Sequence, residues 1–312
     1  MHYKRTFIIA LILLVLFGLG KAVIGQEVVP VTPDVIVWQP ADIPTRDTLT
    51  GPAKAGFAPA LTKVKFLGKQ PGGNNLKYRL EDANGNEWVV KVADESQAEV
   101  AANRLLWAIG YRTEIDQIVP KINIEGIGNY KNARFELRTK EITRGDRWSW
   151  AGNPLAGTKE FDGLRIMMAL VNNWDLKDDN NVFITEGGKQ YLVVSDMGSS
   201  FGKLADKSKT RSGRSVNKPE DFAEAGFIKG VDGGMVVLDY RGMGEDYLKG
   251  IKVENARWLA DLLLQLTDKQ ISDTFRAAGY ENEDVNTFTV AIKQRIAALD
   301  AAAKVAVAET TN

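Results

Sequence analysis

Two short stretches carry the side chains whose types and spacing could do chemistry. Asp175, Lys177 and Asn180 fall within one loop-like segment, while Asp196 follows an apolar, strand-like run and stands close to the flexible Gly198. A carboxylate such as Asp175 can accept the proton of an attacking hydroxyl, and Lys177 could neutralise a phosphoryl group in transfer. Asn180 and Asp196 offer the amide and carboxylate oxygens that suit Mg²⁺. The pattern therefore predicts Asp175 and Lys177 as catalytic residues and Asn180 and Asp196 as metal ligands.

The composition excludes most other kinds of active site. The chain has no cysteine, and its single histidine is His2. Disulfides, thiolate nucleophiles, iron–sulfur clusters, zinc sites built on Cys or His, and Ser-His-Asp triads are therefore ruled out. The 40 basic and 40 acidic residues balance, so no global field favours nucleic acid, and we expect no nucleic-acid partner. Whatever chemistry occurs must use carboxylates, lysine, arginine, amides and hydroxyls.

The first half of the chain has the pattern of a sheet with one inserted helix. Five stretches have the alternation or composition of strands: residues 62–67, 76–80, 87–92, 118–124 and 133–140. A helix is expected over residues 96–109, begun by a capping box of Ser96 and Glu99 and ended by Gly110. We expect mainly antiparallel pairing, because the first three strands are joined by short turns.

Two features of this sheet could bind phosphate. Lys91 ends the third strand and Glu99 lies in the following helix. A lysine held by a carboxylate stays charged and can point at phosphate oxygens, although Glu99 could instead only cap its own helix. The turn that contains Gly72 and Gly73 could bring backbone N–H groups close to a phosphate, although a plain hairpin would also use such a turn.

The second half of the chain is mainly helical. We expect helices at residues 158–172, 253–266, 268–278 and 285–305, and a hairpin at 181–185 and 191–195. An irregular stretch at 141–157 joins the two halves, and residues 199–221 form a basic loop with little apolar content. The predicted domains are therefore an N-lobe at 61–143 and a C-lobe at 144–305, followed by a tail at 306–312.

The N-terminus has the pattern of a targeting segment. A basic start is followed by an apolar run over residues 6–19, which is shorter than the ~20 residues of a membrane span. Small residues, Ala22 and Gly25, follow as in a signal peptide, although an uncleaved anchor over residues 1–25 is the alternative. We expect the protein to be exported, whether periplasmic, secreted or associated with the membrane through its N-terminus. Residues 26–60 are rich in proline and predict an extended arm.

The order of these features resembles that of the protein-kinase-like superfamily over about residues 61–300. The features are a strand lysine, a helix glutamate, Asp-x-Lys-x-x-Asn, a hairpin and Asp-x-Gly. The short step from Lys91 to Glu99, and the absence of histidine before Asp175, are similar to the atypical phosphoinositide-kinase-like and secretory-pathway casein-kinase groups. The resemblance implies an α+β, two-lobed kinase-like fold, with an antiparallel sheet and one helix in the N-lobe and a mainly helical C-lobe.

The resemblance also implies a ligand and a role for each matching position. ATP would lie in the cleft with Mg²⁺ or Mn²⁺, and Lys91, paired with Glu99, would hold its α- and β-phosphates. Asp175 would be the catalytic aspartate, and Asn180 and Asp196 would bind the metal. The implied activity is transfer of the γ-phosphoryl group to a hydroxyl of a protein, glycan or lipid acceptor.

Several departures from the family pattern keep alternatives open. Asn173 and Trp174 precede Asp175 where the family has His-Arg, and Met197 replaces the Phe of Asp-Phe-Gly. AMP transfer is one alternative reaction. A catalytically inactive kinase-like envelope protein that binds nucleotide or a protein partner is a second alternative. A third is a carbohydrate-binding module whose Asp-rich loop holds Ca²⁺, which would bind Ca²⁺ without any dependence on nucleotide.

Overall fold

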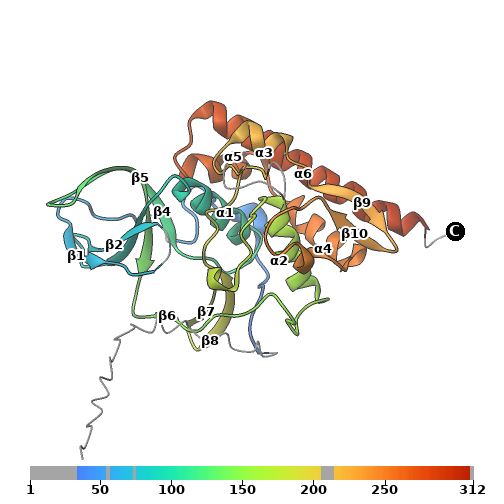
Figure 1. Ribbon diagram of the computed structural model, residues 1–312, viewed down its shortest axis with the longest axis horizontal. Coiled ribbons are helices and arrows are strands. Elements are labelled where there is room, and N and C mark those ends of the chain that lie inside the picture. The colour runs from blue at the N-terminus through green and yellow to red at the C-terminus, as the bar shows by residue number, and fades with distance from the viewer. Residues whose placement is uncertain (1–33, 54–56, 73–74, 205–213, 310–312) are drawn as a thin grey trace, which may run out of the picture.

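The computed structural model describes residues 34–53, 57–72, 75–204 and 214–309, with side chains to Lys304. Two lobes are visible in Figure 1: a sheet with its helix at one end, and a larger, mainly helical part at the other. This is the α+β, two-lobed architecture predicted from the sequence. The predicted targeting segment and the first residues of the arm lie outside the described residues.

The N-lobe is a five-stranded sheet in the order β1-β2-β3-β5-β4, with every neighbouring pair antiparallel. Its strands are β1 (Lys65–Lys69), β2 (Leu76–Glu81), β3 (Glu87–Val92), β4 (Asp116–Ile124) and β5 (Gly128–Arg138). Side chains alternate between the two faces of a strand, and Trp88 and Val90 pack into an apolar cluster on the outer face with Phe135. The same alternation turns Val89 and Lys91 to the opposite face, toward the second lobe.

Helix α1 (Ser96–Ala108) follows β3 and is almost wholly buried. The predicted capping box is wrong, because Glu95 occupies the N-cap position without a side-chain cap hydrogen bond. The Ser96 hydroxyl instead donates to the Lys91 carbonyl at 3.2 Å, and Glu99 binds cations. Those cations offer a fully buried carboxylate stronger, charge-assisted bonds than a backbone N–H would. Gly110 follows the helix with φ of +108°, in the left-handed region that favours glycine.

The C-lobe contains two small sheets and the remaining helices. One sheet joins β6 (Ile142–Arg144), β7 (Asn181–Glu186) and β8 (Lys189–Val194), and the other joins β11 (Ile251–Lys252), β10 (Met235–Leu238) and β9 (Ile228–Asp232). The helices are α2 (Lys159–Leu170), α3 (Pro219–Glu224), α4 (Val253–Leu263), α5 (Asp268–Ala277) and α6 (Asn282–Glu309). Thr158 caps α2 through its side chain, and Thr267 and Gln270 form the predicted capping box of α5. Neither α3 nor the β9–β11 sheet was predicted.

Aromatic side chains form the centre of the C-lobe core. Phe201, Phe222, Phe275 and Phe288 are fully buried, and the rings of Phe275 and Phe288 stack at 4.8 Å. Phe201 lies in the stretch at 199–221 that was expected to be a loop with little apolar content. Its buried ring anchors the beginning of this stretch in the core. Among the described residues, no helix combines the length and the apolar character needed to cross a membrane.

The N-terminal arm packs on both lobes. Ile36 pairs with Tyr191 of β8 in the C-lobe, while the Trp38 indole donates to the Ile109 carbonyl at the end of α1, at 2.6 Å. Further along, the Thr48 hydroxyl donates to the Gln270 carbonyl of α5 at 2.7 Å. The arm therefore joins α1 to the C-lobe and limits how far this helix can swing.

Candidate active site

A cleft of about 1210 Å³ lies between the sheet and the C-lobe. It is lined by six of the eight residues predicted to form the site: Gly72, Glu99, Asp175, Lys177, Asn180 and Asp196. Lys91 is fully buried beside it and contacts two of these carboxylates. Gly73 lies outside the described residues. The structure therefore brings together side chains that are separated by more than a hundred positions in the chain.

Lys91 lies among three carboxylates. Its ammonium is 2.9 Å from Glu99 Oε2 and 3.4 Å from Asp196 Oδ1, and it also contacts Glu95. Burial alone would lower the pKa of Lys91, but Glu99, Asp196 and Glu95 overcome this effect and raise the pKa above its usual value. Lys91 is thus kept charged inside the protein, as a phosphate-binding lysine must be.

Arg134 of β5 is a second cation that holds Glu99. Its guanidinium contacts Glu99 Oε1 with one nitrogen and lies 2.7 Å from Glu136 Oε2 with another. Neither Arg134 nor Glu95 was among the residues predicted for the site. A signal for the first was present, because Arg134, Glu136 and Arg138 alternate along a strand and therefore share one face. Glu95 offered no comparable signal, since an acidic residue at a helix start is common.

Asp175 and Lys177 form an ion pair at 2.8 Å in the loop after α2. Two contacts hold this loop in place: the Asp175 N–H donates to Asn173 Oδ1 at 3.2 Å, and Asn180 Nδ2 donates to the Asp175 carbonyl at 2.7 Å. Lys177 binds only one of the two carboxylate oxygens of Asp175, Oδ2. The other oxygen, Oδ1, accepts no hydrogen bond within the part of the chain that the structure describes. Asp175 Oδ1 can therefore accept a hydrogen bond from a hydroxyl group in the cleft.

Asn180 and Asp196 are held next to each other by the backbone. The Ser195 N–H donates to the Asn180 carbonyl at 2.7 Å, which places the end of β8 against the loop. The Gly198 N–H donates to Asp196 Oδ1 at 3.2 Å. Burial would raise the pKa of Asp196, but Lys91, Arg134 and Lys77 outweigh burial and lower it. Asp196 is therefore an ionised carboxylate that faces the cleft.

The donor set fits a magnesium-type ion at Asn180 and Asp196. Asn180 uses its amide nitrogen within the loop, so its amide oxygen remains as a ligand atom. Mg²⁺ needs only one or two protein ligands besides water and phosphate oxygens. Carboxylate oxygens of Glu95, Glu99 and Asp196 also lie within 4.8 Å of one another, but the Lys91 ammonium already binds all three side chains. The oxygens of Asn180 and Asp196 thus fit the predicted metal position, which stays a prediction.

The cleft wall beyond Lys91 is unusually charged. Arg138 lies 2.6 Å from Glu136 Oε1, and Arg144 of β6 contacts Glu114. Burial favours the neutral form of Glu136, but Arg138, Arg134 and Arg144 overcome it and lower its pKa to about 2. Ligand pockets are usually lined mainly by apolar and aromatic side chains. A ligand of this wall would instead meet arginine and glutamate side chains.

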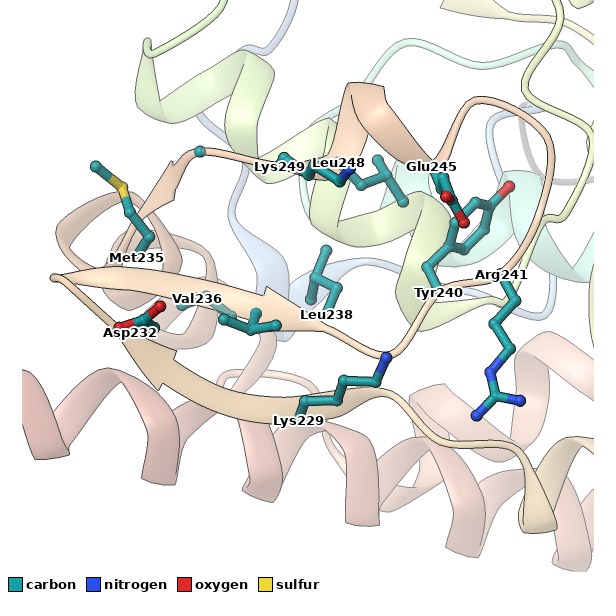
Figure 2. Close-up of a pocket in the computed structure, with 12 residues that line it drawn as sticks. Lys229, Asp232, Met235, Val236, Leu238, Tyr240, Arg241, Glu245, Leu248 and Lys249 are labelled. Atoms are coloured by element: carbon teal, nitrogen blue, oxygen red, sulfur yellow. The ribbon is translucent and has the colours of Figure 1, made fainter.

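A second hollow, of about 630 Å³, lies on the C-lobe. Figure 2 shows it between β10 and the segment that carries Leu248 and Lys249, with Val236 and Leu238 on one side and Tyr240 at one end. None of the eight predicted site residues lines it. The interlobe cleft is therefore the candidate active site.

Comparisons with known proteins find similar solved structures but no similar sequence. No family model and no curated protein matches its sequence. Among solved structures, it is similar to the Helicobacter pylori proinflammatory kinase CtkA, with 10% identity, a TM-score of 0.47, and coverage of 77% of this chain and 95% of that one. It is also similar to the Rio2 kinase of Chaetomium thermophilum in its ADP/Mg²⁺-phosphoaspartate complex, with 12% identity, a TM-score of 0.32, and coverage of 75% and 71% respectively.

A third similar structure is the Shewanella oneidensis complex of HipA, HipB and operator DNA. It shares 12% identity and has a TM-score of 0.32, with coverage of 84% of this chain and 67% of that one. At these values no residue role is carried over from the solved structures. The chain's own strand order, its single N-lobe helix and the buried Lys91–Glu99 pair are those of the two-lobed kinase-like fold that the sequence predicted.

Proposed function

We propose that the protein is an exported, metal-dependent, kinase-like phosphotransferase. It moves the γ-phosphoryl group of ATP to a hydroxyl of a protein, glycan or lipid acceptor. One observation carries this proposal: a buried lysine paired with Glu99, an Asp175–Lys177 pair and the oxygens of Asn180 and Asp196 all meet at one cleft. Phosphoryl transfer needs little more than positioning and charge neutralisation.

Each side chain has a task that its contacts support. Lys91 binds phosphate oxygens, and Glu99 keeps it in place. Asp175 Oδ1 accepts a hydrogen bond, and then the proton, from the hydroxyl group of the acceptor. Lys177 neutralises negative charge on the phosphoryl group during transfer. Asn180 and Asp196 would hold Mg²⁺ or Mn²⁺, which supplies positive charge to the phosphate oxygens when bound.

Export belongs to the proposal because it rests on the sequence pattern of residues 1–25. An exported enzyme would meet acceptors outside the cytoplasm, where ATP is scarce. A membrane-associated N-terminus would keep the enzyme close to lipid or envelope acceptors. Fractionation of cells that produce the full chain tests this part: recovery of all the protein in the cytoplasm would refute export and leave the chemistry open.

The activity is tested by thermal shift with ATP and Mg²⁺ or Mn²⁺, followed by transfer of labelled γ-phosphate. The parent should be stabilised only when nucleotide and metal are both present. Asp196→Ala should lose this metal-dependent shift, and Asp175→Asn should keep binding but lose transfer by two or more orders of magnitude. Glu125→Gln, in the turn between β4 and β5, is the matched control and should behave as the parent. Absence of any nucleotide-dependent shift in the parent would end the proposal.

A specific observation favours the inactive kinase-like protein as second candidate. Glu95 accepts a hydrogen bond from Asn75 Nδ2 at 2.6 Å and forms an ion pair with Lys91. This carboxylate would therefore compete with phosphate for the ammonium of Lys91. Such a protein would bind nucleotide or a protein partner without turnover. ATP binding with no transfer under any metal would support this candidate over the enzyme.

A further inference from the structure

Lys77 of β2 stands directly opposite Lys91 of β3 in the antiparallel ladder. Residues that face each other in this way have their Cβ atoms roughly 5 Å apart on the same face of the sheet. Like charges at such positions destabilise the sheet. The repulsion between the two lysines therefore opposes the stability of the sheet, and nearby carboxylates such as Glu99 and Glu136 offset part of it.

The two lysines differ in their partners. Three carboxylates surround Lys91, whereas the ammonium of Lys77 forms no ion pair and no hydrogen bond with any residue that the structure describes. Its neighbour on the same strand, Arg79, is held by Glu87 at 2.8 Å. Lys77 thus has no ion pair among the described residues, although its charge also acts on the nearby Glu136.

Lys77 faces the cleft where the phosphates of a nucleotide would enter. It lines the cleft with Gly72 and Asn75 of the adjacent turn, and the Gln70 N–H donates to its carbonyl at 2.9 Å. Asp196 lines the same cleft. An anion bound in the cleft next to Lys77 and Lys91 would be attracted to both ammonium groups. This attraction would offset the repulsion between the two lysines.

We propose that Lys77 is a second phosphate-binding lysine, which together with Lys91 holds two phosphates of one polyphosphate chain. The inference rests on the proposed function and names a binding residue that the family-type motif does not contain. It predicts a preference for ligands with two or more linked phosphates over those with one.

Calorimetric titration of the full chain with ATP, AMP and inorganic tripolyphosphate, each with Mg²⁺, tests the proposal. Lys77→Met should bind ATP and tripolyphosphate about tenfold more weakly or worse, because a charge-assisted hydrogen bond is lost. Binding of AMP should change less than threefold. Lys77→Arg should restore most of the affinity, and Lys77→Gln gives a second neutral variant should Lys77→Met fold poorly.

The chain contains a matched control. Lys121 of β4 and Lys131 of β5 form another directly opposed lysine pair, and neither residue lines the cleft. Relief of repulsion should leave both Lys77→Met and Lys131→Met at least as heat-stable as the parent without ligand. Only Lys77→Met should lose affinity for ATP.

The outcomes separate this inference from the proposed function. If Lys77→Met loses affinity for ATP and AMP equally, or for neither, the role of Lys77 is overturned while nucleotide binding by the protein stands. A parent that binds tripolyphosphate but not ATP would overturn the proposed function, and weaker tripolyphosphate binding by Lys77→Met would still support the inference. A parent that binds none of the three ligands would overturn both.

Discussion

Asp116, the first residue of β4, offers the sharpest test of the buried charge network behind the site. Its side chain is fully buried, and Oδ2 accepts a hydrogen bond from Asn103 Nδ2 of α1 at 2.7 Å. Oδ1 has no hydrogen-bond partner, and Arg134 is no closer than 4.0 Å. Burial raises the pKa of Asp116 from 3.8 to about 7, although Arg134 and Asn103 oppose the rise.

The sign and size of the effect on stability follow from linkage. Because the folded state prefers the protonated carboxyl, the stabilising contribution is complete below the unfolded-state pKa of 3.8 and is lost as the pH rises through about 7. A difference of this size in pKa corresponds to about 4 kcal/mol of unfolding free energy. Asp116→Asn keeps the acceptor for Asn103 and cannot titrate, so it should not show this loss.

Urea denaturation of both proteins, at pH values from 4 to 8, measures the prediction. The stability of the parent relative to Asp116→Asn should fall by up to about 4 kcal/mol between roughly pH 4 and pH 7 and then level off. Taking the difference cancels the titration of the other carboxylates. It also cancels any constant cost of an amide N–H₂ without an acceptor. Asp232→Asn, on the exposed end of β9, serves as control and should leave the pH profile unchanged.

Parallel profiles for the parent and Asp116→Asn would refute the reasoning. Such a result would mean that Asp116 is ionised at neutral pH, and that Arg134 offsets its burial. A loss of stability as the pH falls, seen only in the parent, would contradict the predicted sign.

Three further changes test other parts of the structure. Glu95→Gln should bind ATP several-fold more tightly in calorimetry, since a carboxylate no longer competes with phosphate for Lys91; weaker binding would instead make Glu95 part of the binding site. Gln270→Ala removes hydrogen bonds of 2.7 and 2.9 Å to two carbonyls of the arm and should lower the unfolding free energy by about 2–3 kcal/mol, whereas Lys269→Ala next to it should cost less than about 1 kcal/mol. Phe288→Ala opens the aromatic core and should cost about 3–5 kcal/mol in the same assay; a loss below about 1 kcal/mol would contradict the packing described.

The sequence predicted those parts of the fold that depend on local pattern. The sequence placed Lys91 at the end of the third strand and Glu99 in the helix that follows, so their meeting needed only the packing of one helix on one sheet. The strands of the N-lobe and the long helices followed from periodicity in the same way. The catalytic and metal-binding roles of Asp175, Lys177 and the other cleft residues stay predictions.

The parts that could not be predicted depend on contacts between distant segments. Ser96 and Glu99 have the spacing of a capping box, but Arg134 and Lys91 take the carboxylate because both cations are buried beside it. Phe201 lies in a stretch whose composition indicates a loop, yet its ring packs against phenylalanine rings from three different helices. The β9–β11 strands are short, and no single one of them has a periodicity that distinguishes it from a loop.

The N-terminal arm has a consequence for the order in which the chain folds. Residues 43–48 leave the ribosome early, but their partner Gln270 follows more than 220 positions later. Closing so long a loop is entropically costly and must wait for synthesis of α5. Residues 43–48 are therefore among the last to complete their contacts, although their neighbours at Trp107 and Ile109, at the end of α1, are made early. The link that this arm makes between the helix that holds Glu99 and the C-lobe is thus completed only after α5 has been made.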